Sequence, residues 1–183
     1  MSTKRVVVIG GGPGGYVAAI RAAQLGAKVT LVEKDEIGGT CLNRGCIPTK
    51  SLLHDAKIIR SIKRSPVFQS LLAGNFDPLA SMMERKEKVA QELVKGVEIL
   101  LESYRVSIKS AHAELLGPNQ VILLYGGEEK EIIESGTIIL APGSKSKDLP
   151  GISPDGNKII TSDDALKVKK IPPEIVIVGG GYI

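Results

Sequence analysis

The chain opens on a short β-branched run, Val6-Val7-Val8-Ile9, that leads directly into a glycine-rich turn. An apolar run of this length predicts a strand over residues 5–9 that is buried on both faces. Residues 13–25 predict a helix, because the segment is rich in alanine and Gly26 follows its end as a stop signal. Residues 28–33 predict a second strand. A strand, a helix and a strand within about 30 residues form a parallel crossover unit, which indicates an α/β fold with a parallel sheet.

The glycines of the turn have the spacing Gly10-x-Gly12-x-x-Gly15. The first allows a tight turn, the second leaves room for a pyrophosphate, and the third lets the helix pack closely on the strand. Phosphates then meet free N–H groups at the positive end of the helix. Glu33 ends the second strand about 20 residues later, where a carboxylate can accept hydrogen bonds from ribose hydroxyls. We therefore predict a dinucleotide site here; the alternative is a glycine turn without a ligand.

The chain has two cysteines, Cys41 and Cys46. In a straight helix their Cα atoms would be roughly 8–9 Å apart, beyond the ~7 Å limit for a disulfide. A bond between them therefore needs a distorted turn, which Gly45 makes possible. Two separate buried thiols and half of a zinc site are the alternatives, although His54 and His112 do not give zinc-finger spacing.

Two further helices are expected after the glycine turn. The segment from Gly38 to about Lys63 starts as a loop and becomes helical, and a connection follows over residues 65–78. A long amphipathic helix is predicted over residues 79–104. The apolar face is predicted to be Leu52, Leu53, Ala56 and Ile59 in the first helix, and Met82, Val89, Leu93, Val97, Leu100 and Tyr104 in the second. Lys86 falls on that second face and is expected to snorkel toward solvent.

Residues 105–140 consist of short β-branched runs separated by glycine-containing turns, which predicts a small antiparallel meander. Its strands are expected at residues 106–109, 121–125, 131–133 and 137–140. The turn-rich residues 141–172 are interpreted as a linker. Residues 175–178 predict another buried strand, and the glycines that follow repeat the opening of the chain. A second nucleotide-binding domain is therefore expected to begin there.

Composition excludes several classes of function. The formal net charge is +4 and aromatic residues make up 3% of the chain, without tryptophan. No run of five like charges forms a basic arm, and aromatic stacking platforms for nucleic acid are lacking. The four apolar residues near the N-terminus are too few for a signal peptide or a membrane span. We expect no nucleic-acid or membrane partner, and a reducing, cytoplasmic setting.

The segment from Gly38 to Lys50, Gly-Gly-Thr-Cys-Leu-Asn-Arg-Gly-Cys-Ile-Pro-Thr-Lys, resembles the redox-active disulfide motif of the flavoprotein disulfide reductases. Four other stretches agree with that family in the same order: residues 12–19, residues 51–54, residues 161–166 and the glycine-rich residues 179–182. The resemblance spans essentially the whole chain. It implies a Rossmann-like FAD-binding domain over residues 1–145, a linker over residues 146–172, and the beginning of an NAD-binding domain over residues 173–183.

The resemblance also implies residue roles. Cys41 would be the interchange thiol that meets a dithiol substrate, Cys46 would face the flavin as a thiolate, and Lys50 would stabilise negative charge beside the flavin ring. Because a neighbouring cation lowers a thiol pKa, this arrangement suits two-electron transfer. The implied cofactor contacts are Gly10, Gly12, Gly14, Gly15, Glu33, Lys34, Gly39, Thr40, Cys41, Lys50, Ala113, Ala141, Gly143 and Ser144 for FAD, and Gly179 and Gly181 for NAD.

The motif is most similar to family members that oxidise dihydrolipoyl groups and reduce NAD. This implies lipoyl domains of 2-oxoacid dehydrogenase or glycine-cleavage complexes as partners, and a homodimer. Reductases of the mercuric or glutathione type, and a non-catalytic flavin-binding fragment, are the alternatives. Pro142 departs from the family pattern and removes a backbone donor near the expected cofactor. Family members also continue into further domains that carry a His–Glu acid–base pair, so this chain alone is expected to be inactive.

Overall fold

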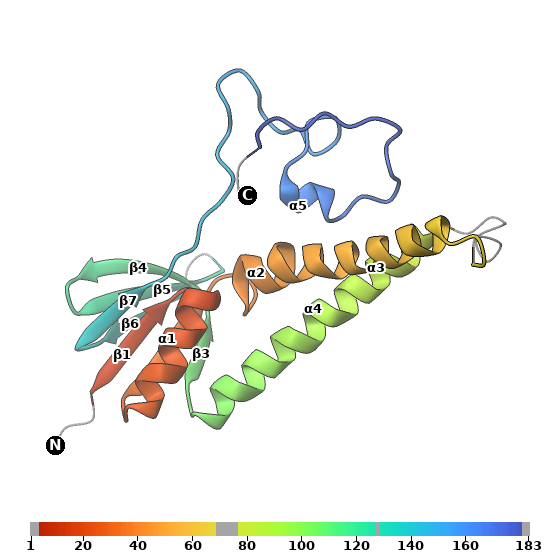
Figure 1. The fold of residues 1–183 in the computed structure, drawn as a ribbon. Coiled ribbons are helices and arrows are strands. Elements are labelled where there is room, and N and C mark those ends of the chain that lie inside the picture. The colour runs from red at the N-terminus through yellow and green to blue at the C-terminus, as the bar shows by residue number, and fades with distance from the viewer. Residues whose placement is uncertain (1–3, 69–76, 127–128, 181–183) are drawn as a thin grey trace.

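The computed structural model describes residues 4–68, 77–126 and 129–180. A parallel sheet of four strands has the order β3-β2-β1-β7, and it lies at one end of the molecule (Figure 1). The strands are β1 (Arg5–Ile9), β2 (Lys28–Glu33), β3 (Ser107–Ser110) and β7 (Thr137–Leu140). Helix α1 (Pro13–Gln24) connects β1 to β2, which pair in parallel. The parallel crossover predicted from the opening sequence is therefore confirmed.

A separate antiparallel sheet has three strands, β4 (His112–Gly117), β5 (Gln120–Tyr125) and β6 (Glu129–Glu134). The prediction of a four-stranded antiparallel meander was wrong, because two of its four strands belong to the parallel sheet. Residues 107–110 and 137–140 pair with β2 and β1 in the parallel sheet, and residues 112–117 form a strand that was not predicted. Local periodicity does not show which sheet a short strand joins, because its partner can lie far away in the sequence.

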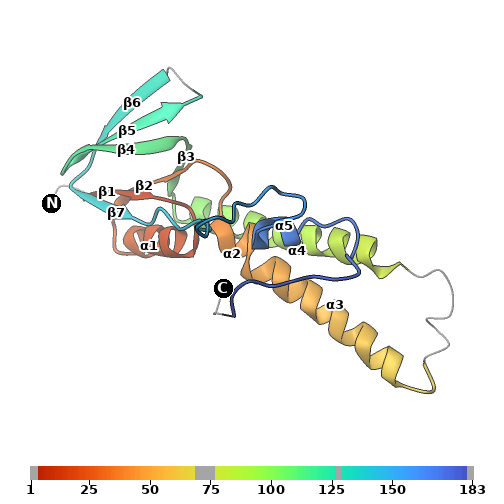
Figure 2. The same cartoon turned by 90° about the horizontal axis from the view of Figure 1, so that it is seen from above.

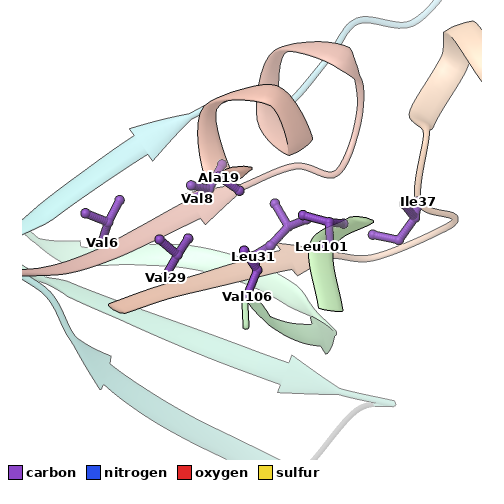
Figure 3. Close-up of a cluster of buried hydrophobic side chains, with 8 residues drawn as sticks. All are labelled: Val6, Val8, Ala19, Val29, Leu31, Ile37, Leu101 and Val106. Atoms are coloured by element: carbon purple, nitrogen blue, oxygen red, sulfur yellow. The ribbon is translucent and has the colours of Figure 1, made fainter. Parts of the chain in front are cut away.

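The core is divided between the two faces of the parallel sheet. On one face, Val6 and Val8 of β1 pack with Ala19 of α1 (Figure 3). On the other face, Val7 packs with Val121 and Leu123 of the antiparallel sheet. Consecutive residues of β1 thus point into different clusters, which explains why its sequence is apolar without alternation.

Three helices extend from one end of the sheets: α2 (Gly39–Arg44), α3 (Cys46–Arg64) and α4 (Pro78–Ser103) (Figure 2). The buried residues of α4 are Leu79, Lys86, Ala90 and Leu101. The predicted apolar face was therefore partly wrong, because Leu93, Leu100 and Tyr104 are 41%, 44% and 39% exposed. In α3, Pro48 and Ser51 are buried, whereas Leu53 is 54% exposed. Both helices contact different partners along their length, so no single stripe is covered throughout.

Residues 142–180 pass over these helices largely as irregular chain, with one short helix, α5 (Ser162–Ala165). Residues 175–178 are not a buried strand, because they pair with no other strand of the described chain and are 63–88% exposed. A buried strand requires neighbours in a sheet, which the described residues do not offer at this place. No helix in the described ranges is both long and apolar enough to cross a membrane.

Candidate site at the glycine turn and the cysteine pair

The glycine-rich turn lies at the carboxyl end of β1, and two of its glycines are required by the packing of the protein itself. Gly10 has φ +105°, and its N–H donates to the Val32 carbonyl oxygen at 2.8 Å. A Cβ on Gly10 would collide with the carbonyl oxygen of Ala141, and a Cβ on Gly15 would collide with that of Gly10. No other residue fits these two positions, which bring β1, β7 and α1 together.

Gly12 is different, because the protein leaves space around it. Its φ is −73°, which any residue can adopt, and an added Cβ would meet only the Cα of Gly39, at 3.8 Å. Gly12 is also the N-cap of α1, followed by Pro13 at the first position of the helix. The open space therefore lies at the positive end of a twelve-residue helix, where a phosphate is stabilised. That this space receives a phosphate stays a prediction.

The Glu33 carboxylate lies beside this turn. Its Oε2 accepts the N–H of Gly11 at 2.6 Å, and its Oε1 accepts the N–H of Asp35 at 2.8 Å. These two bonds fix the carboxylate at the end of β2. Each carboxylate oxygen can accept more than one hydrogen bond, so the group still has acceptor capacity for ribose hydroxyls.

The segment that carries the cysteines begins directly against the turn. Gly38 donates its N–H to the Gly11 carbonyl oxygen at 2.9 Å. A Cβ on Gly39, whose φ is +54°, would lie 2.7 Å from the Cα of Gly12. Asn43 is part of the cysteine motif, but the sequence did not predict a role for it. Its side-chain amide donates to the carbonyl oxygens of Ile37 and Gly39, both at 3.0 Å. The amide side chain thereby ties α2 to the loop that directly precedes it.

The helix is interrupted between the two cysteines. Cys41 lies in α2, Cys46 is the first residue of α3, and Gly45 between the helices has φ −147° and ψ −113°. A Cβ on Gly45 would approach the Thr40 carbonyl oxygen to 2.9 Å, so glycine suits this break. The distortion that the spacing required is therefore present. Both cysteines are free thiols in this structure, and the disulfide between them stays a prediction.

The two thiols differ in their surroundings. Cys41 is half-buried and Cys46 is exposed. Burial raises the pKa of Cys41 above the ordinary value, and the neighbouring Cys46 thiol raises it further. The positive charge of Lys50 acts in the opposite direction on the same pKa. Lys50 is thus close enough to affect Cys41, whereas its role beside a flavin ring stays a prediction.

Only some of the residues that were predicted to contact a cofactor lie at the carboxyl ends of the parallel strands. Ala141 follows β7 and donates its N–H to the Ile9 carbonyl oxygen at 2.8 Å, next to the turn. Ala113 lies in β4 and packs against the core between the two sheets. The side chains of Lys34 and Thr40 are exposed, and so are Gly14 and Gly143, Ser144 and Gly179. Gly181 lies outside the described residues.

Two other observations limit where a ligand can be placed. No group of metal-binding side chains is found in the described ranges, and His54 and His112 are exposed. A hollow of about 880 Å³ lies beside Arg5, Asn119 and Thr137, at the amino ends of β1 and β7. Ligands of open parallel sheets bind outside the carboxyl ends of the strands, so the glycine turn is the candidate site.

Comparison with known proteins gives consistent matches. The family described as "Pyridine nucleotide-disulphide oxidoreductase" matches residues 4–183. A dihydrolipoyl dehydrogenase of Bacillus subtilis is 41% identical over 186 residues, which cover 97% of this chain and 39% of the relative. The mitochondrial dihydrolipoyl dehydrogenase of Pisum sativum is 42% identical over 180 residues, with 97% and 36% covered. The chain thus spans less than half the length of these relatives.

Solved structures agree with the fold. LpdA from Mycobacterium tuberculosis superposes with a TM-score of 0.82 at 24% identity, covering 93% of this chain and 38% of that one. The HOCl-induced flavoprotein disulfide reductase RclA from Escherichia coli gives a TM-score of 0.73 at 25% identity, covering 92% and 35%. The predicted α/β class, with a parallel sheet and a small antiparallel one, is confirmed.

Proposed function

This chain belongs to the pyridine nucleotide-disulphide oxidoreductase family, and from that premise we propose that it forms the flavin-binding, cysteine-bearing part of a dihydrolipoyl dehydrogenase. The proposed reaction oxidises a dihydrolipoyl dithiol and reduces NAD. The observation that supports it best is the direct contact between Gly12 and Gly39, which joins the phosphate turn to the helix of Cys41. A dinucleotide bound at the turn would therefore lie next to the cysteine pair.

The residues of the turn fit FAD. The open space at Gly12 and the N–H groups of α1 would hold the pyrophosphate, and Glu33 would accept the ribose hydroxyls. The bound flavin supplies the capacity to accept an electron pair from the cysteines and pass it to a nicotinamide. Ala113, Ala141, Gly143 and Ser144 remain proposed contacts, as do Gly179 and Gly181 for NAD.

The proposed chemistry at the cysteines is thiol–disulfide exchange. A substrate thiolate attacks the Cys41 sulfur, the Cys41–Cys46 bond breaks, and Cys46 leaves with the electron pair as a thiolate. The second substrate thiolate then displaces Cys41, which closes the substrate disulfide and completes the two-electron reduction of the protein pair. Cys41 leaves as a thiolate, and its raised pKa means that the displaced sulfur then takes up a proton from solvent. The charge of Lys50 lowers the pKa of Cys41 and so favours its thiolate form.

We extend the proposal to organisation and partners. Residues 1–145 would form the FAD-binding domain, residues 146–172 a linker, and residues 173–183 the start of an NAD-binding domain. The partners would be lipoyl domains of 2-oxoacid dehydrogenase or glycine-cleavage complexes, in a homodimeric enzyme. A cytoplasmic location is proposed as well. A mercuric or glutathione reductase activity is the alternative, and a panel of dithiol and disulfide substrates distinguishes it.

Flavin binding tests the proposal at its central residue. Titration with FAD, followed by flavin fluorescence, should show binding by the wild-type chain and at least a tenfold loss of affinity in Gly12→Val. The variant is expected to fold, because the φ of Gly12 is ordinary and its Cβ position is free. Gly96→Val is the matched control, since Gly96 lies on α4 with nothing within 4 Å of an added Cβ. Unchanged affinity in a folded Gly12→Val protein contradicts the assignment, as does a wild-type chain that does not bind FAD.

A further inference from the structure

The segment from residue 142 to residue 180 has no buried side chain. Its half-buried positions all lie within residues 160–168: they are Ile160, Thr161, Asp163, Asp164, Leu166 and Val168. The segment therefore contacts the rest of the protein in one short stretch, around α5. Since apolar burial is small there, the placement of this segment depends on a few polar contacts.

Helix α5 satisfies its own N-terminus. Thr161 accepts the N–H of Asp164 at 3.4 Å, and the Asp164 carboxylate accepts the N–H of Thr161 at 2.9 Å, which is a capping box. The carbonyl groups at the other end have no partner within the helix, as in any helix. The carbonyl oxygen of Leu166, the C-cap residue, accepts a hydrogen bond from Lys86 of α4 at 2.6 Å.

Lys86 is unusual among the lysines of the chain, because it is buried, with only 6% of its surface exposed. It was expected to snorkel, but its Nζ reaches the Leu166 carbonyl oxygen instead. The one carboxylate near it, that of Glu87, lies 3.7 Å away and is exposed. Burying a cationic group is costly unless it is hydrogen-bonded, so this contact satisfies Lys86 as well as α5. Among the described residues, it is the only hydrogen bond between residues 142–180 and the rest of the chain.

A second polar contact reaches α2, the helix that carries Cys41. Arg44, between Cys41 and Cys46 in the sequence, has its Nη2 3.2 Å from Asp35 and its Nε 3.9 Å from Asp163 of α5. Asp35 follows β2, two residues after Glu33. The Arg44 guanidinium, on α2, thus lies between the loop after β2 and α5.

The space between these contacts is not filled. A small cavity of about 200 Å³ is lined by Arg44, Pro48, Lys86, Asp163 and Leu166, among others. A packed apolar interface would leave no such space. The attachment of α5 is therefore held by polar contacts with specific geometry rather than by a continuous core.

We infer that Lys86 and Arg44 are positioning residues, which hold residues 161–167 against α4 and α2 and thereby place the following chain relative to the cysteine pair. The following chain leads to the second glycine-rich sequence, the proposed start of the NAD site. The expected effect on NAD rests on the proposed function, whereas the contact between Lys86 and Leu166 does not. Loss of the contact should weaken the binding of NAD, and it should leave the rate of thiol–disulfide exchange at Cys41 unchanged.

Hydrogen–deuterium exchange on this chain tests the contact. The amides of Ala165, Leu166 and Lys167 are hydrogen-bonded within α5 and report its stability. In Lys86→Met they should exchange about tenfold faster or more, because a buried hydrogen bond from a charged donor is lost while the apolar stem is kept. Lys88→Met, an exposed neighbour on α4, should leave the exchange unchanged, and Lys86→Arg should restore much of the protection. Unchanged exchange in a folded Lys86→Met protein overturns the inference.

A second measurement separates positioning from a merely structural role. In a protein that carries this chain at the length of its curated relatives, Lys86→Met should raise the KM for NAD several-fold. The rate at which a dithiol reduces the protein should stay unchanged, and the melting temperature should not fall. An unchanged KM for NAD despite faster exchange of α5 overturns the positioning role. Failure of the wild-type protein to be reduced by dihydrolipoamide contradicts the proposed function instead, and leaves the exchange result intact.

Discussion

Two nearly identical sequences begin very different regions of this molecule. Val6-Val7-Val8-Ile9 with its glycines forms a buried strand, a tight turn and the start of a helix. Ile175-Val176-Ile177-Val178 with its glycines is exposed and pairs with no strand of the described chain. The first run has β2 on one side and β7 on the other. The comparison shows that the motif becomes a site only where neighbouring strands and a covering helix complete it.

The glycines show the same difference in another way. Around the first turn, a Cβ on Gly10 or Gly15 would collide with backbone atoms of other segments. Around the second, an added Cβ on Gly179 or Gly180 would meet nothing within 4 Å. Glycine is therefore a packing requirement in the first region, whereas in the second it has no such role in this structure.

The largest expected effect of this difference is on turnover. The FAD-loaded chain should reduce NAD with dihydrolipoamide about 10⁴-fold more slowly than a dihydrolipoyl dehydrogenase such as the Bacillus subtilis relative, or not at all. The acid–base histidine of the family is expected in a further domain, and among the described residues the second glycine sequence is not assembled on a sheet. A steady-state assay of NAD reduction measures this. Activity within tenfold of the relative would break the comparison, because it would require a nicotinamide site that the second region does not form here.

The next effect is on stability. Gly15→Ala should destabilise the protein by about 1–3 kcal/mol or more, because the new methyl group overlaps the Gly10 carbonyl oxygen. Gly180→Ala should change the free energy of unfolding by less than about 0.5 kcal/mol, as expected for an exposed site without contacts. Chemical denaturation of both variants provides the measurement. Equal destabilisation would show that the second region is packed as tightly as the first.

The smallest effect concerns the thiols. In the reduced, flavin-free chain, iodoacetamide should modify Cys46 before Cys41, because Cys46 is exposed and the pKa of Cys41 is raised. Lys50→Met should raise the pKa of Cys41 further, so that its alkylation begins only at higher pH. Lys57→Met, an exposed lysine further along α3, is the control. Mass spectrometry of samples alkylated across a pH series measures both effects, and earlier modification of Cys41 at neutral pH contradicts this description of the pair.

Much of the site could be predicted from the sequence because its signals are local. The need for glycine at position 15 arises within the turn, from the Gly10 carbonyl oxygen, and the break at Gly45 lies within the five-residue step between the cysteines. Glu33 is placed by the length of one crossover unit. In each case the residues that decide the geometry are close in sequence to those that use it.

The errors have a different origin, since each involves residues far apart in the chain. The strand at residues 137–140 was assigned to the wrong sheet, because its partner β1 lies more than 120 residues earlier. Lys86 was expected in solvent, but a carbonyl group of residue 166 accepts its hydrogen bond. Residues 175–178 have the composition of a buried strand without the partners. A sequence pattern indicates that a segment can be buried. Whether it is buried depends on the strands and helices that pack against it.

The central claim is that the glycine turn and the cysteine helix form one flavin–disulfide unit, and disulfide mapping of the FAD-loaded chain tests it most directly. The folded protein is oxidised, freed of reductant, treated with an alkylating reagent and digested, and its peptides are analysed by mass spectrometry without reduction. We predict one intramolecular bond between Cys41 and Cys46 and no alkylated cysteine. Two freely alkylated thiols in folded, oxidised protein would contradict the claim, because the unit would then lack the group that exchanges electrons with a dithiol.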